Sequence, residues 1–374
     1  MSRKNRNQPR VAIIGTRGYP SYYGGFETAV RRLVPNLADA GWDVTVYGRK
    51  GTQNDDPTRD PRVAVRQTRG IESKALSTLT YGLTASSDAI VRGSDVALVM
   101  NVANGFWLPF LRLRGIPTVV NVDGIEWERA KWGKLARAVF RAGAWLTAKF
   151  ADTIVVDAEA IGDYWRKKFG RESVFIPYGG DLDAGFDVPL GLRRRQYVLV
   201  VARFVPENTI AEFLEAAEAL ADEHDVVIVG SSGYGGELDE RARALADGNE
   251  KVQWLGHLSD DRLLHALWEH AGVYFHGHSV GGTNPALVQA MALGAPTVAL
   301  DTVYNREVLG ADHTAFVPAE PREISSAIVT VLGDPEQQEH MSALATERAR
   351  HRYSWRSVAE GYEAALRQLV AKEK

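Results

Sequence analysis

The sequence predicts an α/β protein with two doubly wound, Rossmann-like domains facing across a cleft. Short apolar runs rich in Val and Ile alternate with helical patterns, which is typical of parallel strands covered by helices. This alternation occupies the first half of the chain and starts afresh after residue 195. The length of 374 residues accommodates two domains of ordinary size, each with its own core.

The first series of predicted strands comprises residues 11–14, 44–47, 96–100, 118–121 and 153–156. The second series comprises residues 197–201, 226–229, 252–254, 273–276 and 297–300. Between them lies a segment rich in Gly, Asp and Pro that ends in three consecutive arginines and is unlike a packed element. The boundary is therefore expected near 185–195, with a first domain at residues 1–188 and a second at 189–354.

Composition narrows the function classes. The chain has no cysteine, which excludes a disulfide framework or a thiolate metal site and suits a reducing cytosol. Its longest apolar runs are too short to span a bilayer, and its N-terminus lacks the apolar core of a signal peptide, so we expect a cytoplasmic protein. The net charge of -3 gives no reason to expect nucleic acid as a partner. No cluster of candidate ligands in the sequence predicts a metal.

The segment HGHSVGGTNP at residues 276–285 is the most informative about function. It predicts the end of a strand, a glycine-rich loop, and a helix from about Pro285 to Gly294. The free N–H groups at such a helix start bind anions. One short turn also gathers the hydrogen-bonding side chains of His276, His278, Ser279, Thr283 and Asn284. This density favours a ligand-binding loop over an ordinary strand-to-helix turn, which is the alternative.

Two further loops follow predicted strands. Arg203 follows an apolar run from Tyr197 to Ala202, and a guanidinium there can bind a diphosphate through several donors; a surface salt bridge is the alternative. The first strand ends at Gly15, and its loop is poor in side chains, so a ligand can approach the backbone. The glycine spacing of that loop differs from G-x-G-x-x-G, which argues against an NAD-dependent oxidoreductase. A long flexible turn is the alternative.

Segments along nearly the whole chain resemble one family. They are VAIIGTRGYP and YGGFE within 11–27, VNVDGIEW at 120–127, IPYGGD at 176–181, VARFVPEN at 201–208, the 276–285 loop, and NREVL at 305–309. Together they resemble retaining GT-B glycosyltransferases of the glycogen-synthase-like superfamily (family-four type), and in particular bacterial rhamnosyltransferases of surface-polysaccharide synthesis. The resemblance implies two domains of the GT-B fold, with a last helix at 355–374 that crosses back to the first domain.

The resemblance also implies an activity. A sugar, L-rhamnose from dTDP-L-rhamnose or the sugar of a UDP-sugar, would pass with retention to a lipid-linked glycan precursor, without a cofactor. The implied donor-binding residues are Arg203, Asn208, His278, Ser279, Gly281, Gly282, Thr283, Asn284 and Gln289.

Three of these positions depart from the wider superfamily. Related enzymes commonly carry Lys at the position of Asn208, and glutamates at those of Gly281 and Gln289. The rhamnosyltransferase-like subgroup shares Gly281, whose loop can contact the sugar through backbone N–H groups. The Gln289 amide can still accept a bond from a ribose hydroxyl, although it lacks a carboxylate's charge, a difference of about 1 kcal/mol. Alternatively, Gln289 is a solvent-facing helix residue.

In the first domain, the resemblance implies that Gly24 and Gly25 lie against the donor diphosphate or the acceptor, with Glu27 in the first helical turn. A solvated or capping role for Glu27 is equally compatible with the sequence. Asp123 and Glu126 follow strand 118–121 and are the candidate catalytic residues, because a carboxylate there could bind the acceptor hydroxyl or take its proton. A turn signal and a helix-start charge are the alternatives. The donor phosphate can also assist, so a protein base is not required.

Basic and aromatic residues interleave over residues 129–150. At helical spacing, Lys134, Arg137, Arg141 and Trp145 share one face. Such a face suits an anionic membrane surface and a polyprenyl-diphosphate acceptor, which would place the protein peripherally at the inner face of the cell membrane. An ordinary solvated helix face is the alternative.

Two rival functions remain open from sequence. A nucleotide-sugar 2-epimerase can share the fold and would act on the donor without an acceptor. A catalytically weakened nucleotide-sugar-binding subunit is suggested by Asn208 and Gln289.

Overall fold

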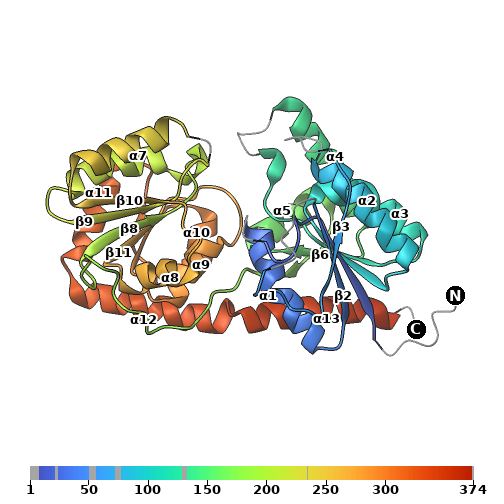
Figure 1. Ribbon diagram of the computed structural model, residues 1–374. Helices are drawn as coiled ribbons and strands as arrows, with labels where there is room; N and C mark the ends of the chain where they lie inside the picture. The colour runs from blue at the N-terminus through green and yellow to red at the C-terminus, as the bar shows by residue number, and fades with distance from the viewer. Residues whose placement is uncertain are drawn as a thin grey trace. The chain divides into compact units, whose positions relative to one another are not determined.

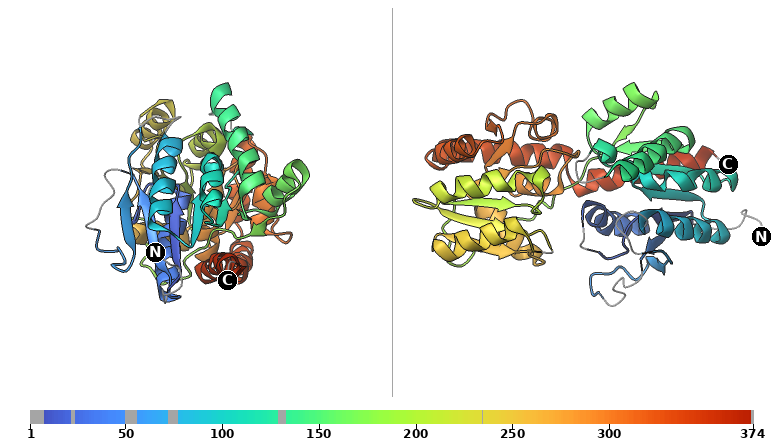
Figure 2. Two further views of the ribbon diagram at one scale, coloured as in Figure 1. Left: turned by 90° about the vertical axis from the view of Figure 1, so that its right-hand side faces the viewer. Right: turned by 90° about the horizontal axis from the view of Figure 1, so that it is seen from above.

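The computed structural model describes residues 8–21, 24–49, 56–71, 77–128, 133–233 and 235–372. The chain divides into two compact units. Unit 1 comprises Met1–Pro177 and Trp355–Lys374, and unit 2 comprises Tyr178–Ser354. Each unit contains one parallel sheet with helices on both of its faces (Figure 1), and Figure 2 shows the same layering from two further sides. The predicted α/β class with two Rossmann-like domains is confirmed.

Within the described residues, the sheet of unit 1 has seven strands in the order β3-β2-β1-β4-β5-β6-β7. The strands are β1 (Arg10–Ile14), β2 (Asp43–Gly48), β3 (Ala64–Gln67), β4 (Val96–Met100), β5 (Thr118–Asn121), β6 (Thr153–Val156) and β7 (Val174–Phe175). Val11 pairs with Val44 on one side and with Val96 on the other. The direction of strand addition therefore reverses between β1 and β4. All residues of the edge strands β3 and β7 are exposed or half-buried. Neither strand therefore shows the run of buried apolar residues by which the sequence pattern predicts the other strands of this sheet.

The helices of unit 1 are α1 (Gly25–Asp39), α2 (Ser77–Arg92), α3 (Leu108–Leu113), α4 (Lys134–Phe150), α5 (Glu159–Phe169) and α13 (Trp355–Lys372), with short 3-10 helices η2 (Val102–Trp107) and η3 (Glu126–Glu128). Helix α1 buries Val30, Leu33, Val34 and Leu37, which recur at the spacing of one helix face. That face packs against the sheet.

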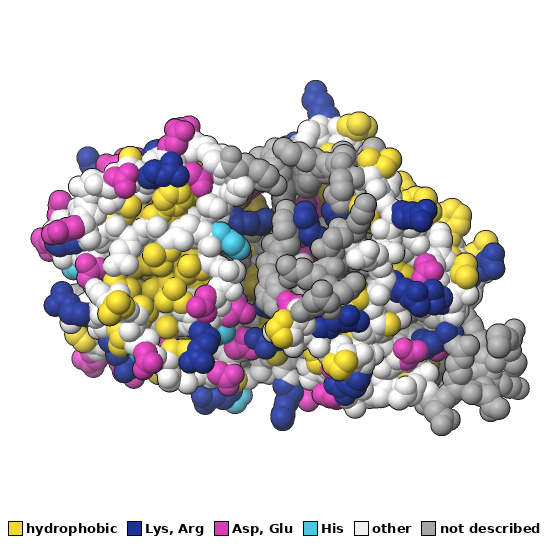
Figure 3. All heavy atoms as spheres, in the orientation of Figure 1, with side chains coloured by type: hydrophobic (Ala, Val, Ile, Leu, Met, Phe, Trp, Pro, Cys, Tyr) yellow, Lys and Arg dark blue, Asp and Glu magenta, His cyan; other side chains and the backbone are white. Residues whose placement is uncertain are grey.

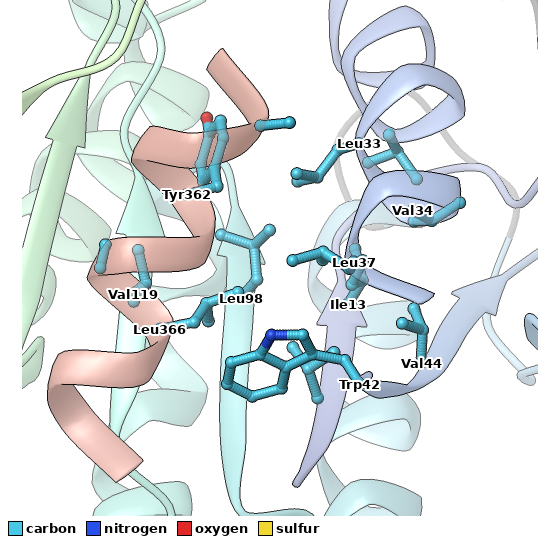
Figure 4. Close-up of a cluster of buried hydrophobic side chains, with 14 of the residues drawn as sticks. Ile13, Leu33, Val34, Leu37, Trp42, Val44, Leu98, Val119, Tyr362 and Leu366 are labelled. Carbon is cyan, nitrogen blue, oxygen red and sulfur yellow. The ribbon is translucent and has the colours of Figure 1, made fainter. Parts of the chain in front are cut away.

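Helix α13 completes the core of unit 1 (Figure 4). Tyr362 and Leu366 of α13 lie in one buried cluster with Leu37 of α1, Leu98 of β4 and Val119 of β5. The Asn121 side chain at the end of β5 donates a hydrogen bond from Nδ2 to the Tyr362 hydroxyl at 2.6 Å. Residues far apart in the chain thus share one core, and α13 belongs to unit 1.

Within the described residues, the sheet of unit 2 has six strands in the order β10-β9-β8-β11-β12-β13. They are β8 (Tyr197–Val201), β9 (Asp225–Val229), β10 (Val252–Gly256), β11 (Val273–His276), β12 (Thr297–Leu300) and β13 (Phe316–Val317). The helices are α6 (Ile210–Leu220), α7 (Glu237–Gly248), α8 (Asp261–His270), α9 (Pro285–Ala292), α10 (Val303–Leu309), α11 (Pro321–Leu332) and α12 (Pro335–Arg352), with the 3-10 helix η4 (Pro206–Asn208). Here strand addition reverses between β8 and β11.

Strand β11 separates two environments because successive side chains point to opposite faces of a sheet. Val273 and Phe275 belong to the hydrophobic cluster under α6 and α11, where Phe275 stacks on Phe213. Tyr274 and His276 lie on the other face, and Tyr274 meets the edge of Trp268 from α8. The hydroxyl of Tyr274 and the imidazole of His276 are therefore polar groups buried on that face of the sheet.

The segment before β8 packs with unit 2. Gly180 donates its N–H to the Tyr353 carbonyl at 2.8 Å, and a Cβ at Gly180 would lie 2.9 Å from the Val288 carbonyl oxygen of α9. Turn composition alone suggests a boundary at 188/189, whereas these backbone contacts tie the residues from Tyr178 onward to unit 2.

Candidate functional site

The candidate site of unit 2 lies where strand addition reverses. Strands β8 and β11 are neighbours, with Val198 paired to Val273, and each is followed by one of the predicted functional loops, 202–209 and 277–284. Ligands of open parallel sheets bind outside the carboxyl ends of the strands at such a reversal. Topology therefore brings Arg203 and the glycine-rich loop to the same edge of the sheet.

The two loops are joined by hydrogen bonds. Ser279 donates from its N–H and from its hydroxyl to the Glu207 carbonyl, at 2.9 and 2.8 Å. Thr209 donates from Oγ1 to the Gly277 carbonyl at 2.7 Å. Thr209 also has a φ of 54°, a left-handed conformation that is rare for a β-branched residue and is often held at functional sites. The Ser279 hydroxyl thus fastens the loops together.

Arg203 and Asn208 differ in their roles. The Arg203 side chain is exposed and makes no hydrogen bond or ion pair with any part of the chain that the structure describes. Asn208 is buried and donates from Nδ2 to the Arg203 carbonyl at 2.9 Å. Asn208 therefore shapes the loop that presents Arg203 and adds no positive charge of its own.

Three side chains form a column on one face of β11 and its extension. The Tyr274 hydroxyl is hydrogen-bonded to His276 Nδ1 at 2.9 Å, and the His276 ring stacks on that of His278, with centroids 4.4 Å apart and planes at 11°. Burial lowers the pKa of His276 well below 6.5. Burial and then the charge of Arg203 lower the pKa of His278 to about 3. Both imidazoles are neutral at physiological pH.

The glycine-rich loop leads into α9. Gly281 has a φ of 106°, which disfavours any side chain, and Gly282 follows it. Thr283 is buried, and Asn284 caps the helix by accepting a hydrogen bond from the Ala286 N–H at 2.9 Å. The predicted loop and helix start are both present.

Gln289 lies on the buried side of α9. Its Oε1 accepts a hydrogen bond from the Asp181 N–H at 2.9 Å, and its Nε2 donates to the Asp181 carbonyl at 3.0 Å. Gln289 is not a solvent-facing helix residue, because only 9% of it is exposed. Both the oxygen and the nitrogen of its side-chain amide are thus bonded to the backbone of Asp181.

Asn305 is a further site residue, to which sequence reasoning gave no role although it begins the NREVL segment. It is buried, and its Nδ2 donates to the carbonyls of His278 and Leu300, at 3.1 and 2.8 Å. Asn305 therefore fixes the backbone of the glycine-rich loop at His278.

Strand addition in unit 1 reverses between β1 and β4, and Gly15 at the end of β1 has a φ of 99°. A Cβ at Gly15 would lie 2.3 Å from the Met100 carbonyl oxygen, so the two loops touch. Gly24 and Gly25 begin α1. Glu27 is buried, and its Oε1 accepts a hydrogen bond from the Arg17 N–H at 3.1 Å. Glu27 therefore holds the loop against its helix; it does not cap α1, because Arg17 lies outside the helix and the N-cap residue Gly24 has no side-chain hydrogen bond.

Asp123 follows β5, one strand beyond this reversal. It has a φ of 57°, and its N–H donates to Asn121 Oδ1 at 2.9 Å. Its half-buried carboxylate makes no hydrogen bond or ion pair with described residues. Glu126 is buried within η3. Asp123 is the better placed of the two to receive a ligand.

Of the basic aromatic segment, residues 129–132 lie outside the described residues. Helix α4 exposes Lys134, Leu135, Arg141, Trp145 and Lys149. Over the described residues, no helix is long and apolar enough to cross a membrane, and no group of His, Asp or Glu side chains has the arrangement of a metal site.

Two family models match the chain. The model for a "Glycosyl transferase 4-like domain" matches residues 24–179, and that for "Glycosyl transferases group 1" matches residues 189–348. No curated protein matches the sequence.

Solved structures similar to this chain share its fold. Sucrose-phosphate synthase from Thermosynechococcus elongatus has a TM-score of 0.82 at 21% identity, covering 98% of this chain and 100% of that one. HepE from Anabaena in complex with UDP-glucose has a TM-score of 0.74 at 16% identity, covering 96% and 99%. A mutant of TarM from S. aureus, in complex with fondaparinux, α-GlcNAc-glycerol and UDP, has a TM-score of 0.74 at 11% identity, covering 97% and 100%.

The two matched segments succeed one another along the chain, and each lies largely within one of its two Rossmann-like units. The chain therefore belongs to the GT-B glycosyltransferases of group 1, with a glycosyl transferase 4-like domain, and uses a nucleotide-sugar donor.

Proposed function

We propose that this enzyme is a retaining rhamnosyltransferase that moves L-rhamnose from dTDP-L-rhamnose onto a lipid-linked glycan precursor of a surface polysaccharide. The observation that supports a donor site most strongly is the exposed, unpaired Arg203 beside the glycine-rich loop at the strand reversal of unit 2, as far as the described residues show. The choice of rhamnose is supported by the resemblance of the 276–285 loop to the rhamnosyltransferase-like subgroup.

In this proposal, Arg203 binds the donor diphosphate and stabilises the negative charge that grows on it as the sugar leaves. The backbone N–H groups of the loop around Gly281 donate hydrogen bonds to the sugar, because a glycine at this position leaves them accessible. The start of α9 adds a favourable dipole for the anion.

Asp123 and Glu126 are the proposed acceptor-side residues, with Asp123 in contact with the acceptor hydroxyl. The bond between the sugar C1 and the diphosphate oxygen breaks while a bond from C1 to the acceptor oxygen forms on the same face. The proton of the acceptor hydroxyl passes to a donor phosphate oxygen. Asp123 then orients the acceptor, and no separate protein base is needed.

The proposed lipid acceptor fits the surface of α4. Its exposed residues Lys134, Leu135, Arg141, Trp145 and Lys149 are basic or apolar, and Lys149 Nζ lies 5.1 Å from the Trp145 ring centroid. Helix α3 packs beside α4. Yellow apolar and dark-blue basic side chains are interspersed on this side of unit 1 (Figure 3). We propose that this face contacts an anionic membrane.

The membrane contact is tested with vesicles of phosphatidylglycerol and of phosphatidylcholine. Co-sedimentation with only the anionic vesicles, weakened by Arg141→Glu and Trp145→Ala, is expected. Equal sedimentation with both kinds, or no effect of these variants, contradicts the proposal.

One observation favours a rival, a weakened nucleotide-sugar-binding subunit. Asn208 adds no charge, and the Gln289 amide is engaged with the Asp181 backbone. The rival predicts nucleotide-sugar binding without transfer to any acceptor.

The deciding experiment titrates the purified protein with dTDP-L-rhamnose, UDP-glucose, UDP-N-acetylglucosamine and GDP-mannose, with the free nucleotides as controls. Each donor that binds is then incubated with and without polyprenyl-linked saccharides. Selective binding of dTDP-L-rhamnose and acceptor-dependent release of dTDP are expected. Tighter binding of another donor would mean that its sugar, and not rhamnose, is transferred. Epimerised donor in the absence of acceptor would indicate an epimerase. Binding of a donor without turnover would favour the weakened subunit.

A further inference from the structure

We infer that Tyr274 and His276 are positioning residues, which hold the His278 ring as a hydrogen-bonding partner of the donor diphosphate. This inference rests on the proposed donor site and assigns two buried side chains to it. Neither residue lies in a loop, and their roles follow from the column they form with His278.

His276 is an unusual buried group. His276 is fully buried, and its Nδ1 is hydrogen-bonded to the Tyr274 hydroxyl, but its Nε2 is enclosed without a partner among the described residues. An unsatisfied buried nitrogen costs free energy, and most folded proteins avoid it. An apolar residue would avoid this cost, although it would leave the buried Tyr274 hydroxyl without its bond to His276. The histidine at this position therefore points to a role beyond packing.

The His276 ring orients the neighbouring His278 ring. The two imidazole rings are nearly parallel at 4.4 Å, so the plane of His276 sets the plane of His278. The backbone of this segment is fixed as well, because Asn305 binds the His278 carbonyl and Ser279 binds the Glu207 carbonyl. The His278 ring is thus held by stacking on His276, and the main chain at His278 and Ser279 is held by hydrogen bonds to other loops. Such preorganisation is typical of binding groups.

The groups around His278 match the chemistry of a diphosphate. His278 is the half-buried member of the column, whereas Tyr274 and His276 are buried, and the charge of Arg203 acts on it. A diphosphate needs both a cation and directional N–H donors. Arg203 supplies the charge, and a neutral His278 supplies an oriented N–H without burying a second cation next to the first.

The test is a double-mutant cycle with Tyr274→Phe and His278→Phe. Phenylalanine removes only the hydroxyl of Tyr274, and at His278 it keeps an aromatic ring, slightly larger than imidazole, without the two nitrogens. The probes are the diphosphates of uridine, thymidine and guanosine, and the corresponding nucleosides, measured by calorimetry or by competition. Tyr197→Phe is the matched control, because Tyr197 is also fully buried on a neighbouring strand and its hydroxyl donates to a backbone carbonyl, that of Leu267.

Each single variant is expected to weaken binding of the best diphosphate about two- to tenfold, the range for one lost hydrogen bond, and to leave nucleoside binding unchanged. The double variant should bind like His278→Phe alone, because Tyr274 acts only through His278. Additive losses, equal losses for nucleoside and diphosphate, or the same loss in Tyr197→Phe overturn the inference. If the unmodified chain binds none of the diphosphates, the proposed donor site itself fails.

Discussion

The side-chain amide of Gln289 forms two hydrogen bonds with the backbone of Asp181, accepting from its N–H and donating to its carbonyl. This arrangement fastens α9 to the segment that enters unit 2. A glutamate at the same position could accept from the N–H but, when ionised, has no donor for the carbonyl. The glutamine is therefore matched to a backbone contact within the protein.

We predict that Gln289→Glu lowers the free energy of unfolding by about 1–3 kcal/mol, because a carboxylate would face a buried carbonyl. Activity should not rise. Urea denaturation and donor titration measure both effects. Gln338→Glu is the control, since buried Gln338 also donates to two carbonyls, those of Arg195 and Gly272, away from the loop. A large gain in activity with unchanged stability would instead support the weakened-enzyme view.

Arg203→Gln should reduce affinity for the nucleotide sugar about ten- to hundredfold, the range for a lost charge-assisted hydrogen bond. Stability should hardly change, because the exposed guanidinium has no partner in the described parts of the chain. Calorimetric titration tests the first point and thermal unfolding the second. The control is Arg194→Gln, which removes another exposed arginine of unit 2. If both variants bind the donor equally well, Arg203 does not contact the diphosphate.

Buried histidines should make unit 2 sensitive to acid. Burial lowers the pKa of His276 well below 6.5, that of His278 to about 3, and that of His313 to about 4. Below pH 6.5 these three histidines bind protons in the unfolded chain but not in the folded chain. The free energy of unfolding therefore falls with decreasing pH, by up to about 1.4 kcal/mol per pH unit for each histidine.

Urea denaturation between pH 7.5 and 5 measures this slope. His313→Gln should reduce the histidine contribution by about a third, because one of three such groups is removed. An identical slope in this variant would show that His313 is not held neutral in the folded chain.

The bond between Asn121 and Tyr362 links α13 to the loop that carries Asp123, because Asn121 also accepts from the Asp123 N–H. Tyr362→Phe leaves the Asn121 amide without its partner and should cost about 1–3 kcal/mol of stability. Transfer to acceptor should fall while nucleotide binding is retained. Steady-state kinetics and thermal unfolding provide the measurements.

The matched control for Tyr362→Phe is Leu369→Ala. This change removes apolar packing from the same helix and costs about 2–5 kcal/mol without touching Asn121. An equal loss of acceptor use in both variants would mean that general loosening of unit 1, rather than the position of Asp123, is responsible.

The sequence predicted the strands with buried apolar runs in both units, since such runs are a local signal. It did not predict β3, β7 and β13, which are short edge strands. It located the loop around Gly281 through its density of glycine and polar residues. The roles of Asn208 and Asn305 could not be read from the sequence, because their partners lie on backbone carbonyls brought near by folding.

The sequence by itself determined the α/β class, its doubling along the chain, and the residue types available for binding a nucleotide sugar, because periodicity and composition are local properties. Only the tertiary structure decided which groups remain free to meet a ligand. Ser279, Glu27 and Gln289 are engaged in bonds within the protein, whereas Arg203 is left without a partner among the described residues. The physical reason is that hydrogen-bond satisfaction depends on which backbone groups the strand order brings together.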